Sequence, residues 1–430
     1  MQQGFLLQYV LMFQKIKRAF YFPVASYFRF WARIQLRVWN PRIIVITGSS
    51  GKTTLLHLIE AQLDHHARYS HKANSSFGIP FDILGLNRKT LSLFEWPMLF
   101  FLAPSGAFKK PYKEKLYVVE VDSDRPGEGK FLGKLLRPEI VIWLSSGRTH
   151  SMNFDSSVQS EKFSTIEDAV ANEFGHVLEC CQRLAIINAD NLNIIKQTFR
   201  TKAKIVKISK KNLKSYIVDS KTHFKTTTND YLINALLPRE SFYSIEASQQ
   251  LLDDLDLPFD PSFKRFSLPP GRCSVFKGIK NTTLIDSSYN ATPDGMKAII
   301  DLFSDYQTKT KWMVISDMLE LGNEEKEEHE KLGELLNTQK INKLVMVGPR
   351  MIGYSLPKIT TKNFPVTSFE QPKDALLYLK ENLAGGETIL FKGARFLEGI
   401  IEHLLNDKED VKKLCRREAV WQKRRKQWGL

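Results

Sequence analysis

Residues 45–54 read VITGSSGKTT and continue a short β-branched run that begins at Ile43. That run indicates a buried strand, and the apolar pattern of TTLLHLIEAQL after it indicates a helix. Between them lie Gly48 and Gly51, and Lys52 follows at once. A glycine-rich turn between a strand and a helix presents backbone N–H groups at the positive end of the helix dipole, where phosphate binds. The stretch therefore predicts a phosphate-binding loop in an α/β fold.

The residue types of this loop suit a nucleotide triphosphate. The glycines let the backbone turn tightly, Lys52 adds a mobile positive charge for the outer phosphates, and Thr53 can present its hydroxyl to Mg²⁺. The predicted nucleotide-binding residues of the loop are Gly48, Ser49, Ser50, Gly51, Lys52, Thr53 and Thr54. An ordinary turn with a chance Lys-Thr is the alternative. We favour the phosphate loop because strand, loop and helix follow one another in the required order.

Strand-like and helix-like segments alternate along most of the chain. The further strand candidates are KLYVVEVD, EIVIWLSS, RLAIINAD, TTLIDSS, KWMVISD, KLVMVG and ETILFKG. Such alternation predicts a P-loop-type, mostly parallel central sheet with helices on both faces, and a second, Rossmann-like α/β domain at the C-terminal end. Residues 201–240 are rich in Lys and Thr and are expected to form an edge hairpin or a connecting excursion.

Four segments follow from this pattern. We expect a basic, aromatic and helical extension over 1–41, a central ATP-binding domain over 42–267, a C-terminal domain over 268–406 and a basic tail over 407–430.

The N-terminal extension is predicted to form two helices broken near Pro23. Arg29, Arg33 and Arg37 are spaced four residues apart and so share one helical face, among several aromatic residues. Such a helix either packs on the next domain with a solvated basic edge or lies on a membrane surface. An amphipathic pattern alone does not separate the two.

Charge is concentrated at the two ends of the chain. The net charge is +15, and residues 1–42 carry seven Lys or Arg and no acidic residue, while residues 411–430 carry eight against Glu418 alone. A nearly neutral body argues against nucleic acid as the partner. The basic ends are instead expected to make weak, peripheral contact with anionic membranes.

The remaining composition indicates a cytoplasmic protein. The apolar stretch GFLLQYVLMF is too short for a crossing of ~20 residues. The four cysteines, Cys180, Cys181, Cys273 and Cys415, lack C-x-x-C spacing, so neither a disulfide framework nor a zinc site is expected.

Only Ser49 and Ser50 separate the two glycines of the loop, whereas the common P-loop has four intervening residues. This shorter G-x-x-G-K-T-T form resembles the Mur ligase family. Further segments are similar to that family in the same order: HKANSSFGIPFDILGL (71–86), VVEVDSDRPGEGKFLGKLLRPEIVI (118–142), AIINADN (185–191), LPPGR (268–272), LIDSSYNATPDGMKA (284–298), ISDMLELGNEEKEEH (315–329) and LFKGAR (390–395).

The resemblance implies an ADP-forming amide ligase that uses ATP and Mg²⁺. A carboxylate would attack the γ-phosphate to give an acyl phosphate, and an amine would then displace phosphate. The motifs of the C-terminal half imply addition of D-alanyl-D-alanine to a peptidoglycan precursor peptide. We also expect the protein to be a monomer. The alternatives are a ligase with another carboxylate acceptor, such as a polymer end, and a nucleotide-binding relative without catalysis.

Roles for single residues also come from the resemblance. The implied catalytic set is Lys52, Glu120 and His150, and the implied metal ligands are Thr53, Glu120 and His150. Arg272 and Asp286 are implied to bind the nucleotide with the loop. The residues implied to contact the other substrates are Asn74, Asn290, Asp317, Glu320 and Lys392.

Four departures from the family pattern alter these expectations. Phe174 stands where the family has a carbamylated lysine, with Lys162 and His176 nearby, so we expect one tightly held Mg²⁺. Ser287 replaces a second Asp, and RESFYSIEA (239–247) replaces H-N-x-x-N, both of which bear on adenosine recognition. With about 41 residues before the first strand, the usual N-terminal domain for the UDP end of the precursor is not expected.

Overall fold

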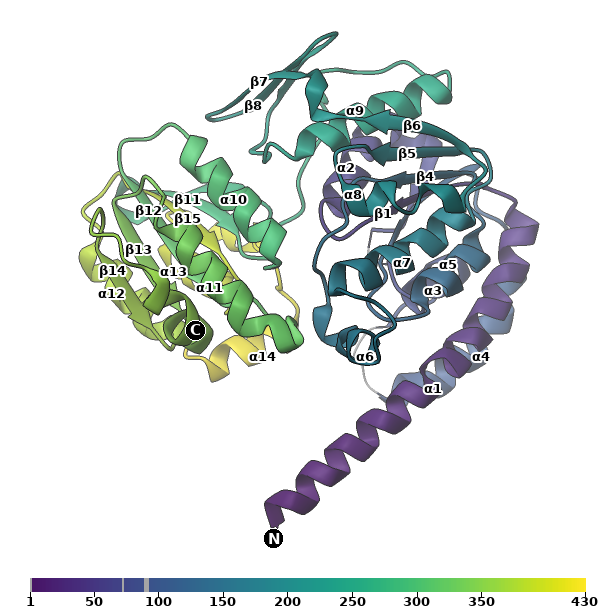
Figure 1. Ribbon diagram of the computed structural model, residues 1–430, viewed down its shortest axis with the longest axis horizontal. Helices are drawn as coiled ribbons and strands as arrows, with labels where there is room; N and C mark the ends of the chain where they lie inside the picture. Colours follow the sequence, from purple (N-terminus) through teal and green to yellow (C-terminus); the bar gives the residue numbers. More distant parts are fainter. Residues whose placement is uncertain (1, 72, 89–92) are drawn as a thin grey trace. The chain divides into compact units, whose positions relative to one another are not determined.

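The computed structural model describes residues 2–71, 73–88 and 93–430 (Figure 1). Within them the chain forms two compact units. Unit 1 contains the chain up to Gly48, Leu63–Leu144 and Ala171–Lys207, and unit 2 contains Ser49–Gln62, Ser145–Val170 and Ile208–Leu430. Each unit is built on a six-stranded sheet with helices, which confirms the predicted α/β class.

Sheet A forms the core of unit 1. Its strands run in the order β2 (Ala67–Tyr69), β3 (Leu116–Val121), β1 (Arg42–Thr47), β4 (Ile140–Trp143), β5 (Leu184–Asn188) and β6 (Lys204–Ile208). β1 pairs in parallel with both β3 and β4 and is buried along all but its first residue. Since strands of a parallel sheet end at the same edge, the carboxyl ends of β1, β3 and β4 lie together, which is where ligands of such sheets bind.

The helices of unit 1 are α1 (Gln2–Trp39), α3 (Gly78–Leu84), α4 (Trp96–Ala107), α5 (Glu128–Leu136), most of α7 (Ile166–Glu179) and α8 (Leu192–Ile195). α1 packs against α3 and α4 (Figure 1). Its buried residues Ala25, Phe28, Ala32, Leu36 and Trp39 recur every three or four positions. One side of this part of α1 is therefore packed on the protein, as the first of the two expected alternatives states, while other side chains of the helix stay exposed.

The prediction of two helices broken near Pro23 is wrong, because α1 is continuous from Gln2 to Trp39. An internal proline costs a helix about 3 kcal/mol. Aromatic packing on both sides outweighs that cost: Phe22 lies 5.6 Å from the ring of Phe131, and the buried Phe28 lies 4.8 Å from the ring of Phe81. Tertiary contacts of this kind are not visible in a local sequence pattern.

Sheet C forms the core of unit 2. Its order is β10 (Ser274–Lys277), β11 (Thr283–Ser287), β15 (Thr388–Lys392), β12 (Lys311–Ser316), β13 (Lys343–Val347) and β14 (Val366–Phe369). β10 is antiparallel to β11, and the other pairs are parallel.

Both faces of sheet C are buried. On β12, Met313 and Ile315 belong to one apolar core, whereas Trp312 and Val314 belong to another. α10 (Pro293–Asp305) and α11 (Glu325–Leu336) supply side chains to the first core, and α12 (Pro372–Asn382) and α13 (Leu397–Leu404) to the second (Figure 1). Burial on two faces explains why the strand sequences are continuously apolar.

The segment 201–240 divides between two structures. β6 lies at the edge of sheet A, and β7 (Leu213–Val218), β8 (Thr222–Thr226) and β9 (Asp230–Ile233) form a separate antiparallel sheet. The remaining helices are α2 (Lys52–Leu63), α6 (Asp155–Gln159), α9 (Ser241–Asp254) and α14 (Ala419–Gln427). Over the described ranges, none of the helices combines the length and apolarity needed to cross a membrane.

Candidate active site

The predicted phosphate loop occupies residues 48–51, between the last residue of β1 and the first of α2. Gly48 has a φ of 133° and Gly51 a φ of 77°, a region that residues with a Cβ rarely adopt. A Cβ built on Gly51 would meet no atom within 4 Å. Glycine at this position is therefore required by the backbone conformation and not by lack of space.

Hydrogen bonds hold the loop to the segment that follows β4. The Ser50 N–H donates to Ser145 Oγ at 2.9 Å, and that hydroxyl donates to the Ser50 carbonyl at 2.7 Å. The Ser49 N–H donates to the Ser145 carbonyl at 3.2 Å, and the Gly147 N–H donates to Ser49 Oγ at 3.0 Å. The loop is thus shaped by the protein itself, which is the preorganisation that phosphate binding needs.

A guanidinium group lies beside the first turn of α2. Arg272 Nη2 donates to Thr53 Oγ1 at 3.4 Å, and the guanidinium carbon lies 4.1 Å from the centre of the Tyr289 ring. Lys52, in the same turn, is only 8% exposed. Unit 2 therefore places Arg272 beside Thr53, next to Lys52 in the chain, and concentrates positive charge at the loop. Their binding of a nucleotide stays a prediction.

A second group of predicted residues lies at the carboxyl ends of β11 and β15. Asp286 is fully buried and accepts hydrogen bonds from the Ser288 N–H at 2.9 Å and the Ser288 hydroxyl at 2.6 Å. Burial raises the pKa of Asp286 to about 6. Burial likewise lowers the pKa of Lys392 to about 8, and its ammonium donates to the carbonyl of Asn290. Asp286, Asn290 and Lys392 thus lie in one part of unit 2.

Asp317, at the end of β12, is fully buried among cations and backbone donors. Arg395 donates to its carboxylate at 2.8 Å, Arg350 lies 3.6 Å away, and the Met351 N–H donates at 3.0 Å. The structure gives Asp317 a positioning role for the segment that follows β15. Direct contact with a substrate stays a prediction.

His329 is the histidine that follows the D-M-L-E-L-G segment, and it holds that segment in place. Its Nε2 accepts the Met318 N–H at 3.1 Å, so its Nδ1 carries the proton and donates to the Glu325 carbonyl at 2.7 Å. Burial lowers the pKa of His329. The residue was part of the family resemblance, but the spacing alone did not reveal this role.

His150 and Glu320 are brought together within unit 2. His150 Nδ1 lies 2.9 Å from Glu320 Oε2, and both residues have positive φ, 48° and 66°. The sequence motifs that contain His150 and Glu320 did not predict this contact, because the two residues are 170 positions apart in the chain. The pair places the imidazole of His150, which can act as a base, beside the carboxylate of Glu320.

Unit 1 holds two other predicted residues, Glu120 and Asn74. Glu120 is the penultimate residue of β3, is in register with Ile46 of β1, and is 8% exposed. Its N–H donates to Ser70 Oγ at 3.0 Å, and the Asn74 carbonyl accepts the Asp122 N–H at 2.8 Å. Asn74 therefore lies beside the end of β3, at the edge of sheet A from which the phosphate loop begins.

Phe174, predicted to stand where the family has a lysine, places an apolar ring at that position in the structure. Phe174, in α7, is fully buried with its ring 6.0 Å from the ring of Trp143. His176 Nδ1 lies 3.1 Å from a carboxylate oxygen of Glu179, and Arg200 Nη2 lies 2.6 Å from the same nitrogen. Phe174 offers no metal ligand.

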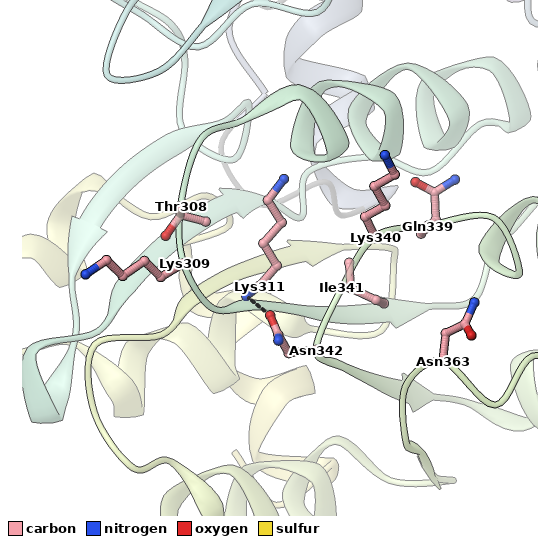
Figure 2. A pocket seen from close by; sticks show the side chains of 8 residues that line it. All are labelled: Thr308, Lys309, Lys311, Gln339, Lys340, Ile341, Asn342 and Asn363. Carbon is pink, nitrogen blue, oxygen red and sulfur yellow. Dashed lines mark hydrogen bonds between the residues drawn. The ribbon is translucent and has the colours of Figure 1, made fainter.

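A cavity of ≈ 440 Å³ opens at the opposite edge of sheet C (Figure 2). It is lined by Thr308, Lys309, Lys311, Gln339, Lys340, Ile341, Asn342 and Asn363. Lys311 begins β12, and its N–H donates to Asn342 Oδ1 at 2.7 Å, as Figure 2 shows. Because ligands of parallel sheets bind at the carboxyl ends of strands, this cavity is a weaker site candidate than the loop.

Comparison with known proteins agrees with these features. The model of the Mur ligase middle domain matches residues 46–248, and that of the Mur ligase glutamate ligase domain matches residues 271–395. The UDP-N-acetylmuramoyl-tripeptide–D-alanyl-D-alanine ligase of Bacillus subtilis is 24% identical over 87% of this chain and 78% of its own length. The Escherichia coli enzyme of that name is 23% identical over 85% and 76%.

Solved structures show the same fold. The MurF ligase of Thermotoga maritima in complex with ADP has a TM-score of 0.71 at 21% sequence identity, over 90% of this chain and 84% of that one. The matched family models together span the phosphate loop, Glu120, His150, Arg272, Asp286 and Lys392. The chain therefore belongs to the Mur ligase family of ADP-forming ligases.

Proposed function

We propose that this protein joins D-alanyl-D-alanine to the peptide of a peptidoglycan precursor, with cleavage of ATP to ADP and phosphate. The preformed loop, fixed to Ser145 and flanked by Lys52 and Arg272, is the observation that carries the proposal. The names of the most similar relatives supply the substrates.

The proposed reaction has two steps. The precursor carboxylate attacks the γ-phosphorus of ATP, the bond to the bridging oxygen breaks, and ADP leaves from an acyl phosphate. The amine of D-alanyl-D-alanine then attacks the acyl carbon, loses a proton and expels phosphate. Lys52 and Arg272 stabilise the charge on the transferring oxygens, while the N–H groups of Ser49 and Ser50 are bonded to Ser145 and fix the shape of the loop. Positioning and electrostatics therefore supply most of the catalysis.

Mg²⁺ is part of the same proposal. It prefers oxygen ligands, which the hydroxyl of Thr53 and the carboxylate of Glu120 offer, and when bound it neutralises phosphate charge. His150 offers nitrogen, a poorer ligand for this ion, and it contacts Glu320. Within unit 2 we therefore propose Thr53 as a ligand of this ion and His150 as an accessory ligand. The role of Glu120, in unit 1, is the one that the family pattern implies.

The decisive experiment supplies the purified protein with ATP, Mg²⁺, the UDP-linked tripeptide and D-alanyl-D-alanine. Mass spectrometry should detect the pentapeptide product with one ADP per product. If phosphate release requires D-alanyl-D-alanine but occurs with a different carboxylate substrate, that carboxylate is the true acceptor and the proposal changes accordingly. Nucleotide binding without phosphate release under any substrate pair would favour the non-catalytic alternative.

A further inference from the structure

The outer surface of α4 is apolar, which is unusual for a helix at a protein surface. Its inner residues are buried: Leu99, Ala103, Gly106 and Ala107. Its outward positions carry Met98, Phe101 and Leu102, and Phe101 is 84% exposed. Phe94 before the helix and Phe108 after it are 93% and 71% exposed. A surface helix normally places polar residues opposite its buried face, but in α4 the exposed Ser105 stands among apolar side chains.

α1 extends this surface. The two helices pack on each other (Figure 1), and the Tyr27 hydroxyl donates to the Phe100 carbonyl at 2.8 Å. The Trp31 ring lies 6.2 Å from that of Phe108 and 5.0 Å from that of Phe30, which is 58% exposed. We call this surface the α1–α4 face, defined by Phe30, Phe94, Met98, Phe101, Leu102 and Phe108. Contiguous exposed apolar side chains of this size mark interaction sites.

The charge on α1 from residue 19 onward and on α4 is positive, and of the acids that flank α4, Glu95 lies 3.8 Å from Arg88 and Glu114 is partly exposed. Arg33 and Arg37 are exposed on α1, and Lys110 and Lys113 are exposed after α4. No Asp or Glu occurs in residues 19–39 or 96–113. Bulky apolar side chains bordered by cations match a bilayer interface, where rings enter the acyl boundary and cations meet lipid phosphates.

We propose that the α1–α4 face docks this protein on an anionic lipid bilayer. α4, with 12 residues, is about 18 Å long and shorter than the ~30 Å bilayer core, so it lies in the plane of the interface. The proposal is independent of the ligase reaction, because none of the residues of the face belongs to the candidate active site.

A second copy of the chain fits this face less well. A twofold contact would bring Arg33, Arg37, Lys110 and Lys113 of one copy close to the same cations of the other, with no acid in either segment to pair them. Protein interfaces are also depleted in lysine.

The test is cosedimentation of the full chain with vesicles of phosphatidylcholine alone or mixed with phosphatidylglycerol. The triple variant Phe94→Ser/Phe101→Ser/Phe108→Ser should bind the mixed vesicles about a hundredfold more weakly than the unmodified protein. Phe199→Ser is the matched control, since Phe199 is 83% exposed in the same unit but outside α4, and should bind normally. The double variant Lys423→Ala/Lys426→Ala tests the C-terminal tail and should change binding little.

Hydrogen exchange on the unmodified protein gives an independent measurement. Mixed vesicles should slow exchange in 94–108 and leave 195–205 unchanged. The proposal is overturned by a triple variant that binds vesicles normally, by tail variants that alone abolish binding, or by a dimer that dissociates in the triple variant without any vesicle binding. Ligation by the triple variant in lipid-free solution should remain normal, so a failure of docking is distinct from a failure of the proposed reaction.

Discussion

Lys52 lies at the start of α2 with little exposure to solvent, beside a loop whose shape does not depend on a ligand. The loop motif and the family pattern predicted nucleotide-binding roles for Lys52, Thr53 and Arg272, but not the contact between Arg272 and Thr53.

Lys52→Ala should therefore abolish ligation while the fold is kept. The lost contact with the transferring phosphoryl group should cost about 3 kcal/mol or more in the transition state. Steady-state ADP release measures the loss, and circular dichroism checks folding. Lys264→Ala, at an exposed lysine of the same unit, is the matched control and should keep full activity. Near-normal turnover by folded Lys52→Ala would refute the phosphoryl-transfer assignment.

Asp286 yields a prediction about pH. Its pKa is raised from 3.8 to about 6 by burial, so the folded state binds the proton more tightly than the unfolded chain. The stabilisation from this proton is complete below about pH 4 and is lost as the pH rises through about 6. Asp286→Asn should accordingly stabilise the nucleotide-free protein by about 3 kcal/mol at pH 7.5 and by about 1 kcal/mol at pH 4.5. Thermal unfolding at both pH values checks this, and a variant less stable at pH 7.5 would contradict it.

Other residue contacts escaped sequence reasoning for one physical reason. The partner of Ser50 is Ser145, that of His150 is Glu320, and that of Asp317 is Arg395. Each pair is distant in sequence and is created by strand order. The family pattern gave the residues of the candidate site, but single-chain spacing does not report which of them touch.

At the scale of elements, the phosphate loop depends on one backbone conformation. Gly51→Ala should lower stability by about 1 kcal/mol and raise the KM for ATP, because φ is 77° there although space for a Cβ exists. Gly353→Ala is matched to it, since a Cβ on Gly353 also meets no atom within 4 Å and no positive φ occurs there. Chemical unfolding and ATP titration compare the two. If the two variants lose the same stability and ATP affinity, the positive φ of Gly51 is not the cause.

α7 provides the prediction on CO₂. Phe174 fills its position with a buried ring, so no carbamate forms there. Ligation in CO₂-depleted buffer should equal ligation after bicarbonate is added. A clear, reversible rise in rate would instead mean that a lysine is carbamylated, and Lys162→Ala would then identify whether it is the one.

Buried strands with clear apolar runs were predicted best from the sequence. Such runs correctly predicted β1, β3, β4 and β5, and the parallel strands β11, β12, β13 and β15. β2, β10 and β14 have three or four residues and little pattern, and were missed. The continuity of α1 through Pro23 was also missed, because contacts with α3 and α4 decide it.

At the scale of the whole molecule, the C-terminal segment is more closely bound than its charge suggested. Arg425 is 5% exposed and lies 3.7 Å from the buried Glu398, which also meets Arg416 at 3.3 Å. The rings of Trp421 and Trp428 lie 6.4 and 6.2 Å from that of Phe396. Charge counts along a sequence do not reveal such partners, and the four-segment division stays a prediction.

Removal of residues 419–430 should destabilise unit 2 by about 3 kcal/mol, since it leaves Glu398 buried with one cation fewer. Thermal unfolding should show a lower midpoint for the truncated chain. Lys423→Ala/Lys426→Ala should leave the midpoint unchanged, because both side chains are exposed. If the truncated chain unfolds at the same temperature as the full chain, α14 does not contribute to the stability of unit 2.

The bonds between the phosphate loop and Ser145 also set an order of events during synthesis. Ser145 follows Ser50 by 95 residues, and a ribosome adds about 5–20 residues per second. The loop therefore leaves the ribosome about 5–20 s before the residue that shapes it. During this interval the nascent chain has the glycines and the lysine but not the Ser145 groups that hold the loop, so we expect ATP to contribute little to its early folding. Nucleotide becomes a stabilising ligand only after β4 has joined the sheet.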